Sequence, residues 1–396
     1  MGGTEMARER ARGTRKAWTA ASAARFAREA RAQTVMHLAR AQAPVKYEAD
    51  ALTVGFKMWR DMYGTAQNAA EMLLAPMGYP PPYDGTFLEY AERIVRDTST
   101  ELAMASMFVI SPTMHDVVVA AAETLTLEDL NRVDEADPPA LAGLVVFPSP
   151  LIRVDAAGDL VDNRAISWAP ATFRLSHQAA RPGVVVTSFV DTFGPVRVAA
   201  FDQFAEQARM HGEPLPPLTL DARQALPFHH DILATPEEMN VRAGIIRDVS
   251  ESGRAKAEEL GMDATTSVGE YESGAQVSDP DDTLTRRYLI AFWRLCEQHI
   301  ADVEQADVPH SAIATATRAR TSPDASVVTL RQRRRVNDDP ATASPVNWTS
   351  RWIVRMHKVE QWYPSLQTHR VLWRGPYVKG PEGLPVKQPA VSALIR

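Results

Sequence analysis

The hydrophobic pattern of the chain changes its period at Pro138-Pro139, and this change narrows the folds that the sequence can form. Before these prolines, apolar residues such as Leu52, Phe56 and Trp59 recur every three or four positions, which indicates amphipathic helices. After them, short apolar runs such as residues 184–190 are separated by Pro, Gly, Asn and Asp, which indicates strands joined by turns. The sequence therefore predicts an α+β fold with a helical N-terminal region and a central antiparallel sheet.

Two helical regions are expected ahead of the sheet. Residues 1–43 are rich in Ala and Arg, with nine basic and three acidic groups, and predict a basic helix that ends before Pro44. This helix is a solvated surface helix, a phosphate-binding helix or an organelle transit peptide. Residues 44–140 predict a helical region, in which positions 101–130 form one segment that is kinked or split at Pro112.

The rest of the chain divides into three further parts. Residues 141–249 predict a β-rich or mixed region, with an antiparallel sheet over about 143–200. Residues 250–282 are polar and acidic, which is typical of a linker or a mobile surface. Residues 283–396 predict a connecting helix, over 284–305, and then a small β-rich or α+β C-terminal module that opens with a strand at 327–335.

Several classes of protein are disfavoured by what the sequence lacks. It has no run of about 18 apolar residues and no secretory signal, so we expect a cytoplasmic protein without membrane contact. Cys296 is the single cysteine, which excludes a disulfide within the chain. Phosphate-binding loops and dinucleotide-binding glycines are missing, and the adjacent His229 and His230 would point to opposite faces of a strand. We therefore expect no cofactor and no metal site.

Charge is divided unevenly along the chain. Of its 43 basic and 49 acidic residues, 12 basic but only four acidic residues lie in 326–396. These last positions therefore carry +8, whereas the first 325 positions carry −14. Such a split indicates that the C-terminal part faces an anionic partner.

The C-terminal module also concentrates aromatic residues, because half of the eight tryptophans lie within 348–383. Aromatic rings stack on bases while Arg and Lys neutralise phosphates, so this mixture is typical of proteins that bind RNA or single-stranded DNA. The alternative is a small sheet that uses Trp and Tyr for its core and Arg for its solvent face. The predicted nucleic-acid-binding residues are Arg351, Arg355, Lys358, Trp362, Tyr363, Arg374, Tyr377 and Lys379.

Strand alternation predicts which residues of 351–357 share a face. Alternate positions of a strand point to the same side, so a buried apolar face is expected beneath a largely basic one. The expected buried positions are Trp352, Val354 and Met356, and the basic face contains Arg351, Ile353, Arg355 and His357.

A sharper hypothesis is a metal-independent, ribonuclease-like site formed by His357, His369 and Arg370. One imidazole would take the proton of a 2′-hydroxyl, the other would protonate the leaving oxygen, and the guanidinium would offset the charge of the transition state. Histidines in a basic groove also serve as plain phosphate or base contacts, so the sequence leaves open whether the protein is an enzyme. The three residues meet only if their strands pair in a suitable register, which the sequence does not fix.

The run 352–365, with His369-Arg370 and 376–383 after it, resembles the C-terminal module of an uncharacterised protein family of actinobacteria, their bacteriophages and their mobile elements. The resemblance covers about residues 326–396, and its most specific parts are 361–365, His369-Arg370 and 377–381. After His357 this chain has Lys358 and Val359, where the family has an aromatic residue and an arginine. The resemblance implies a bacterial or phage setting and no particular activity.

Two functions are predicted from these patterns. The first is a multidomain nucleic-acid-binding protein whose C-terminal module contacts RNA or single-stranded DNA. The second is a non-enzymatic protein, such as a phage structural or host-interference factor, in which the Trp and Arg residues form an interface with a host protein. The oligomeric state is left open by the sequence.

Overall fold

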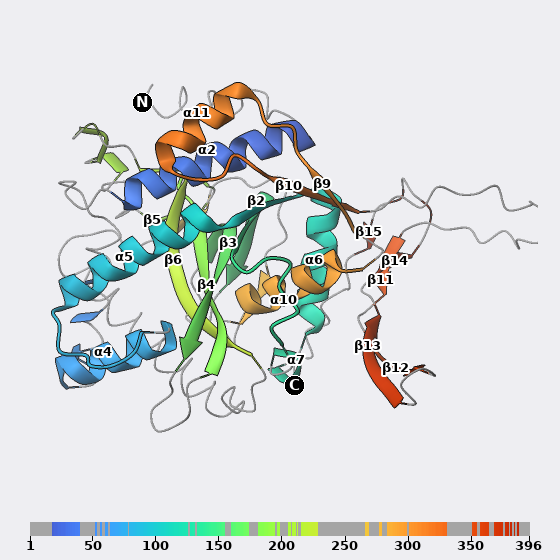
Figure 1. Ribbon diagram of the computed structural model, residues 1–396, viewed down its shortest axis with the longest axis horizontal. Coiled ribbons are helices and arrows are strands. Elements are labelled where there is room, and N and C mark those ends of the chain that lie inside the picture. Colours follow the sequence, from blue (N-terminus) through green and yellow to red (C-terminus); the bar gives the residue numbers. More distant parts are fainter. Residues whose placement is uncertain are drawn as a thin grey trace, which may run out of the picture.

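A mixed β-sheet forms the centre of the molecule, and helices cover both of its faces (Figure 1). The computed structural model describes residues 18–39, 52–53, 56–57, 60–61, 64–77, 79–125, 127–130, 133–154, 160–173, 181–194, 196–198, 205–206, 208–210, 212, 215–228, 266–268, 277–278, 283–298, 301–330, 351–354, 357–363, 368–374, 377–379, 381, 384 and 386–387. Beyond residue 330 it describes mainly the path of the backbone.

Within the described residues the sheet contains eight strands, and seven of them follow the order β6-β4-β3-β2-β1-β10-β9. The first four strands of this order are antiparallel to one another, β1 is parallel to both β2 and β10, and β9 is antiparallel to β10. The eighth strand, β8, pairs with β2. The predicted α+β fold is confirmed. The sheet also has a parallel part, formed by β2, β1 and β10, beside the predicted antiparallel strands. The strands are β1 (Ser106–Ile110), β2 (Gly143–Val154), β3 (Leu160–Phe173), β4 (Arg181–Asp191), β6 (Leu218–Pro227), β8 (Val277–Ser278), β9 (Ala301–Gln305) and β10 (Ser326–Leu330).

Strand β1 lies within the segment 101–130 that the periodicity predicts to be helical, so that prediction is wrong there. Helix α5 (Phe87–Met104) ends before β1, and α6 (Pro112–Thr124) starts after it, with Ser111 as its N-cap. Helices cover both faces of the sheet at β1, so its residues 107–110 are all buried and form a continuous apolar run. Such a short run does not distinguish a buried strand from a helix.

Strand β10 belongs to the central sheet, whereas the sequence predicts that it opens the C-terminal module. Its Val327 and Val328 pair with Val109 and Ile110 of β1, and β9 lies on its other side. Helix α10 (Leu284–Cys296), which is expected to lead into the module, packs against α6 and the sheet instead. The body of the protein therefore extends at least to the end of β10.

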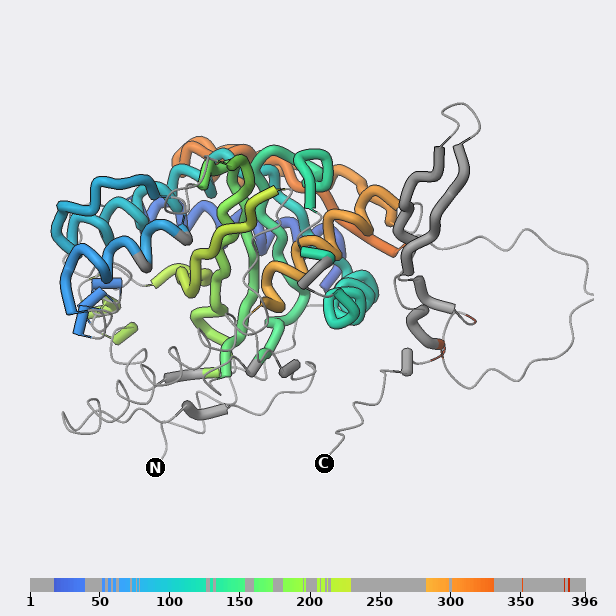
Figure 2. Tube along the Cα trace, turned by 90° about the horizontal axis from the view of Figure 1, so that it is seen from below, coloured from blue at the N-terminus to red at the C-terminus, as the bar shows by residue number. Residues whose placement is uncertain are grey.

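The two faces of the sheet are covered by different helices. Helices α2 (Ala20–Leu38) and α5 cover one face, where Val109 and Phe189 join the alanines of α2 in one apolar cluster. Helices α6 and α10 cover the other face, where a larger cluster includes Trp168 and Trp293. In Figure 2 the strands run through the middle of the body, with α4 (Ala66–Leu74) at one end and α10 towards the other. Both clusters use alternate residues of the same strands, as a sheet packed on two faces requires.

Helix α2 confirms that the basic N-terminal segment contains a helix, but two of its arginines are buried rather than solvated. Nε of Arg28 donates to the carbonyl oxygen of Pro323 at 2.6 Å, and Nη1 of Arg31 donates to that of Ala105 at 2.7 Å. Arg31 also donates to the carbonyl oxygen of Ser322. These guanidinium groups tie α2 to the C-cap of α5 and to the segment between α11 (His310–Ala319) and β10, where they donate to backbone carbonyl oxygens.

Shorter elements complete the body. The 3₁₀ helix η1 (Ala75–Met77) follows α4, α7 (Leu127–Leu130) follows α6, and β5 (Val196–Val198) pairs with β7 (Thr266–Val268). Strands β7 and β8 fall within 250–282, where the sequence predicts a linker or a mobile surface. None of the helices that the structure describes is both long and apolar enough to cross a membrane.

The C-terminal strands form two small sheets. One has the order β14-β11-β15, and the other consists of β12 and β13. In the described part of the chain these strands pair only with one another, as a separate β-rich unit requires. The strands are β11 (Arg351–Val354), β12 (His357–Tyr363), β13 (Thr368–Arg374), β14 (Tyr377–Lys379) and β15 (Val386–Lys387).

Candidate nucleic-acid interface

Most of the predicted site residues lie in the pair of strands β12 and β13. The two strands run antiparallel over seven residue pairs, from His357 opposite Arg374 to Tyr363 opposite Thr368. Residues directly opposite in such a pair share a face, and the faces alternate along each strand. The register therefore assigns every residue of the two strands to a face from the backbone alone.

The register does not bring the two predicted histidines together. His357 lies opposite Arg374, whereas His369 lies opposite Trp362, five positions further along β12. At about 3.3 Å per residue this offset separates the two positions by roughly 16 Å, and an odd offset puts them on opposite faces. Arg370 shares the face of His357 but lies four positions away along the ladder. Proton transfer through both imidazoles at one reacting centre is therefore not supported by this pairing.

The two faces of the β12–β13 pair differ in character. One face combines aromatic positions with cationic ones, and the other carries guanidinium groups beside polar residues. On the first face a tryptophan stands opposite a lysine and another opposite a histidine, a combination suited to stacking on bases and neutralising phosphates. The first face contains Lys358, Glu360, Trp362, His369, Val371 and Trp373, and the second contains His357, Val359, Gln361, Tyr363, Thr368, Arg370, Leu372 and Arg374.

Two predicted contacts, Tyr377 and Lys379, lie in the three-stranded sheet. They belong to β14, where Tyr377 is opposite Val354 and Lys379 is opposite Trp352 of β11. An even spacing puts Tyr377 and Lys379 on one face of the sheet. That face is separate from the β12–β13 ladder, so the predicted contacts are divided between two sheets.

The side chain of Arg351 has a contact within the chain. Its Nε donates to the carbonyl oxygen of Leu384 at 2.9 Å, which holds the segment before β15. This hydrogen bond gives Arg351 a contact within the chain, and its contact with nucleic acid stays a prediction. Arg355, His229 and His230 lie outside the described residues.

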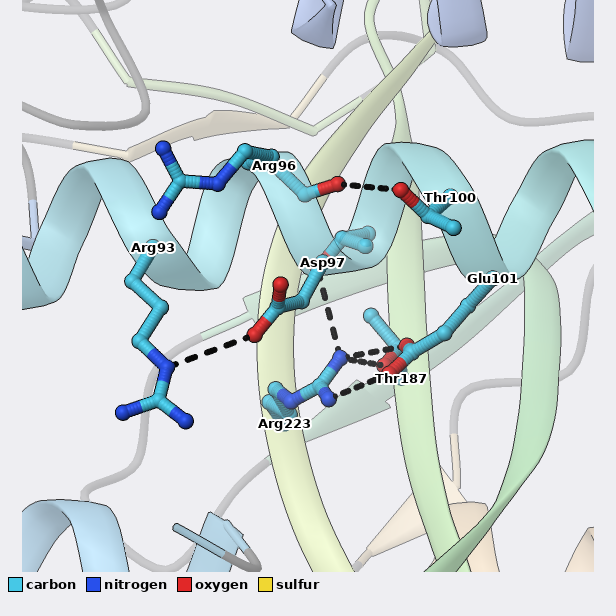
Figure 3. A network of polar contacts seen from close by, with 8 residues as sticks. Arg93, Arg96, Asp97, Thr100, Glu101, Thr187 and Arg223 are labelled. Carbon is cyan, nitrogen blue, oxygen red and sulfur yellow. Dashed lines mark hydrogen bonds and ion pairs between the residues drawn. The ribbon is translucent and has the colours of Figure 1, made fainter.

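The body contains a buried ion pair between α5 and β6 (Figure 3). The two terminal nitrogens of Arg223 contact the carboxylate of Glu101 at 2.6 and 2.7 Å, and the two side chains are 5% and 19% exposed. Arg93 and Asp97, also on α5, form a longer and more exposed pair at 3.7 Å. A bidentate pair between buried groups fixes geometry strongly, so we interpret this network as the attachment of α5 to the sheet.

Three carboxylates come close together on β3, β4 and β6. Burial raises the pKa of Asp162 to about 8, and the charge of Asp191 adds to the shift. Asp221 accepts a hydrogen bond from Nδ2 of Asn163 at 2.9 Å, and Asp191 lies 3.7 Å from Nε of Arg164. Among the residues that the structure describes, no three His, Cys, Asp or Glu side chains are arranged to hold a metal ion. Asp221 and Asp191 are instead paired with side chains of β3, and Asp162 accepts a hydrogen bond from the backbone N–H of Val196 in β5.

His115 is a histidine of the core. Its Nδ1 lies 2.7 Å from the hydroxyl oxygen of Tyr288, and its ring centroid lies 5.2 Å from that of Phe147. Burial lowers the pKa of His115 to about 3, so the imidazole is neutral at physiological pH. It completes an aromatic cluster and is not a candidate for surface proton transfer.

An open cavity of about 630 Å³ lies where β3 ends and β4 begins. Its described walls are mostly apolar, with Pro138, Leu141, Pro170 and Phe228, and Glu135 is the charged residue among them. The volume suits a small molecule, but a single carboxylate beside apolar walls specifies no chemistry.

Sequence reasoning missed two positions that the strand pairing makes relevant, Trp352 and Lys387. Trp352 is expected from alternation to be buried, and its lysine neighbours depend on register. Lys387 lies beyond the dense aromatic segment, and no local signal marks it because its pairing depends on the connection after β14.

A scan against protein-family models and a search of curated proteins find no match to this chain. The resemblance to the actinobacterial and phage family therefore stays a prediction, and the candidate interface rests on the residues of the chain itself.

Proposed function

We propose that the C-terminal strands β11–β15 bind single-stranded nucleic acid, either RNA or DNA. The observation that supports this most directly is the register of β12 and β13, because it gives Lys358, Trp362, His369 and Trp373 one common face. Aromatic rings on such a face stack on unpaired bases while the cations meet phosphates. The charge of +8 on positions 326–396 supports the same function.

The proposal is confined to binding. Cleavage of RNA by two histidines requires both imidazoles at one phosphate, and the register separates His357 from His369. The resemblance of the C-terminal residues supports a bacterial or phage setting for this binding function.

The salt dependence of binding tests the proposal. Full-length protein is titrated into fluorescently labelled oligo(dT) and oligo(rU) of about 20 nucleotides, at salt concentrations from roughly 50 to 200 mM. Affinity should fall with salt, with a slope of log K against log salt of about −0.7 for each phosphate contacted. Lys358→Gln should reduce the slope, whereas Lys57→Gln, an exposed lysine of the body, should leave it unchanged.

An affinity that is independent of salt, or no binding at all, would contradict the proposal. A pull-down from lysate with and without nuclease separates it from the alternative of a protein interface. A partner that stays bound after the nucleic acid is destroyed would favour the alternative.

A further inference from the structure

Trp352 occupies the centre of a cross-strand row in the β14-β11-β15 sheet. It lies opposite Lys379 of β14 on one side and opposite Lys387 of β15 on the other. Neighbouring strands are about 4.8 Å apart, and directly opposite residues lie on the same face. The register therefore puts Trp352 between Lys379 and Lys387 in one cross-strand row, on the same face of the sheet.

The two faces of this sheet have different compositions. The face of Trp352 also contains Tyr377 opposite Val354. The other face contains Arg351, Ile353, Val378 and Val386. A small sheet is stable only when one face is packed, and the face with three aliphatic positions suits that role. On this division Trp352 lies on the open face of the sheet, whereas alternation alone predicts that it is buried; that prediction stays untested.

The arginine on the aliphatic face does not contradict this division. The guanidinium of Arg351 donates to the carbonyl oxygen of Leu384, so its charge is directed at the backbone of the chain. Lys379 and Lys387, in contrast, occupy one cross-strand row with Trp352 between them in the register. The composition of that face is the one that suits a ligand with flat rings and negative charges.

We propose that Trp352, Lys379 and Lys387 form a stacking position for one unpaired base of RNA or single-stranded DNA. The inference rests on the function proposed above and deepens it by naming the mode of contact. The indole stacks on the base, and the two ammonium groups meet the phosphates on either side of that nucleotide. Because every base has an aromatic face, this contact confers little sequence preference.

An unpaired strand fits this row better than a duplex or a protein surface does. In a duplex the faces of the bases are covered by their neighbours, so an indole on a flat strand has nothing on which to stack. Protein interfaces are enriched in Trp and Arg but depleted in Lys, whereas this tryptophan has a lysine on each side.

Variants of the full-length chain test the inference. Binding of labelled oligo(dT) and oligo(rU) is measured by fluorescence anisotropy for Trp352→Leu, Trp352→Phe and the double variant Lys379→Gln/Lys387→Gln. We expect Trp352→Leu to weaken binding by about 5- to 160-fold, the range for loss of one base–aromatic stack, and Trp352→Phe to recover most of the loss. The double lysine variant should reduce the salt slope by about 1.4, which corresponds to two phosphate contacts.

The controls separate this inference from the proposed function. Lys57→Gln should bind like the wild-type protein, and Trp362→Leu tests the β12–β13 face independently. If the wild-type protein binds neither oligonucleotide, the proposed function itself fails. If the wild-type protein binds and Trp362→Leu weakens binding, while the Trp352 and lysine variants behave like wild type, this inference is overturned and the proposed function stands. Should Trp352→Leu lose its circular dichroism signal, the double lysine variant decides the question.

Discussion

Several buried arginines of the described body form hydrogen bonds or ion pairs with other groups of the chain. Arg28 and Arg31 donate to backbone carbonyl oxygens, and Arg223 pairs with Glu101. The sequence predicts that the N-terminal arginines are solvated or bind phosphate, because a charge pattern alone does not reveal a partner distant in sequence. The partners of Arg28 are about 280 to 295 positions away along the chain.

The Arg223–Glu101 pair gives the first prediction at this scale. Glu101→Gln removes the negative charge and leaves a guanidinium that is 5% exposed without its counter-ion. The free energy of unfolding should fall by about 3 kcal/mol, because removing one charge of a buried pair leaves the other without the carboxylate that offsets it. Urea unfolding followed by circular dichroism measures the change.

The matched control for this pair is Arg93→Gln, which breaks the more exposed pair with Asp97 on the same helix. Its effect should stay below about 0.5 kcal/mol, because solvent screens exposed pairs. Equal effects of the two variants would show that the buried pair does not fix α5 on the sheet.

The raised pKa of the buried Asp162 predicts how the free energy of unfolding depends on pH. Burial raises its pKa from 3.8 to about 8 in the folded protein, so the folded chain holds a proton that the unfolded chain loses above its lower pKa. The free energy of unfolding therefore falls as the pH rises between about 4 and 8, by up to about 1.4 kcal/mol for each pH unit from this group. Asp162→Asn stays neutral at every pH and should gain stability over wild type as the pH rises from 5 to 8.

Urea midpoints of wild type and Asp162→Asn at the two pH values measure this difference. Asp61→Asn serves as the control, because Asp61 is an exposed residue of the same type. A difference between Asp162→Asn and wild type that is the same at both pH values would contradict the assignment of the buried proton.

The residue types of the candidate site could be predicted from the sequence, but their grouping could not. Lysine, histidine and tryptophan between 351 and 387 are visible as a dense run. Which of them share a face depends on the pairing of β12 with β13 and of β11 with β14 and β15. A shift of one residue would exchange the faces, and nothing local to the strands determines the shift.

At the scale of elements, the sequence misses or misassigns strands whose neighbours are distant or whose side chains are charged. β1 was missed and β10 was assigned to the C-terminal module, because their parallel pairing joins positions more than 200 residues apart. β6 contains Asp221 and Arg223, which are typical of a loop until their partners on other elements are known. The antiparallel strands β2, β3 and β4 were predicted because neighbours in sequence are neighbours in space.

The contact between β2 and β3 gives a prediction for these elements. Gly143 lies opposite Trp168, and a Cβ atom at Gly143 would approach the indole to 2.1 Å. The indole is 1% exposed and donates to the carbonyl oxygen of Ala140, so it has no space into which to move. Gly143→Ala should therefore lower the free energy of unfolding by about 1–3 kcal/mol or shift the strand pair.

Trp168→Phe in the Gly143→Ala background tests the cause, because the smaller ring relieves the contact. The decrease in the free energy of unfolding should be smaller for the double variant than the sum of the decreases for the two single variants. Gly64→Ala is the control for the backbone, since Gly64 has a φ of 78° and no atom within 4 Å of an added Cβ. Gly64→Ala should lower the free energy of unfolding by about 1–2 kcal/mol because of its backbone conformation alone. Combining it with Trp168→Phe should not reduce this effect. Simple additivity of Gly143→Ala and Trp168→Phe would contradict the proposed clash.

At the scale of the whole molecule, charge and topology divide the chain at different places. The excess of positive charge begins after position 325, and the sequence places the start of the C-terminal module there. The sheet includes residues 326–330 as β10, between β1 and β9. The structural boundary therefore lies after Leu330, and the acidic body keeps its net charge of −14 whether or not β10 is counted with it.

Two truncated chains distinguish these boundaries. A chain that ends at Leu330 retains all strands of the described central sheet and should unfold cooperatively in urea, with the circular dichroism of a folded α+β protein. A chain that ends at Ala325 lacks β10, so β1 loses one neighbour, β9 loses its pairing, and the buried Val328 is removed from the core. We expect the shorter chain to lose its cooperative transition, since the open edge and the cavity together remove several kcal/mol of a stability that is only about 5–15 kcal/mol in total.

Oligonucleotide binding should be lost in the chain that ends at Leu330, because the acidic body remains without the basic strands. Cooperative unfolding of both truncated chains would contradict the boundary after β10, and undiminished binding by the longer one would place the nucleic-acid contacts in the body.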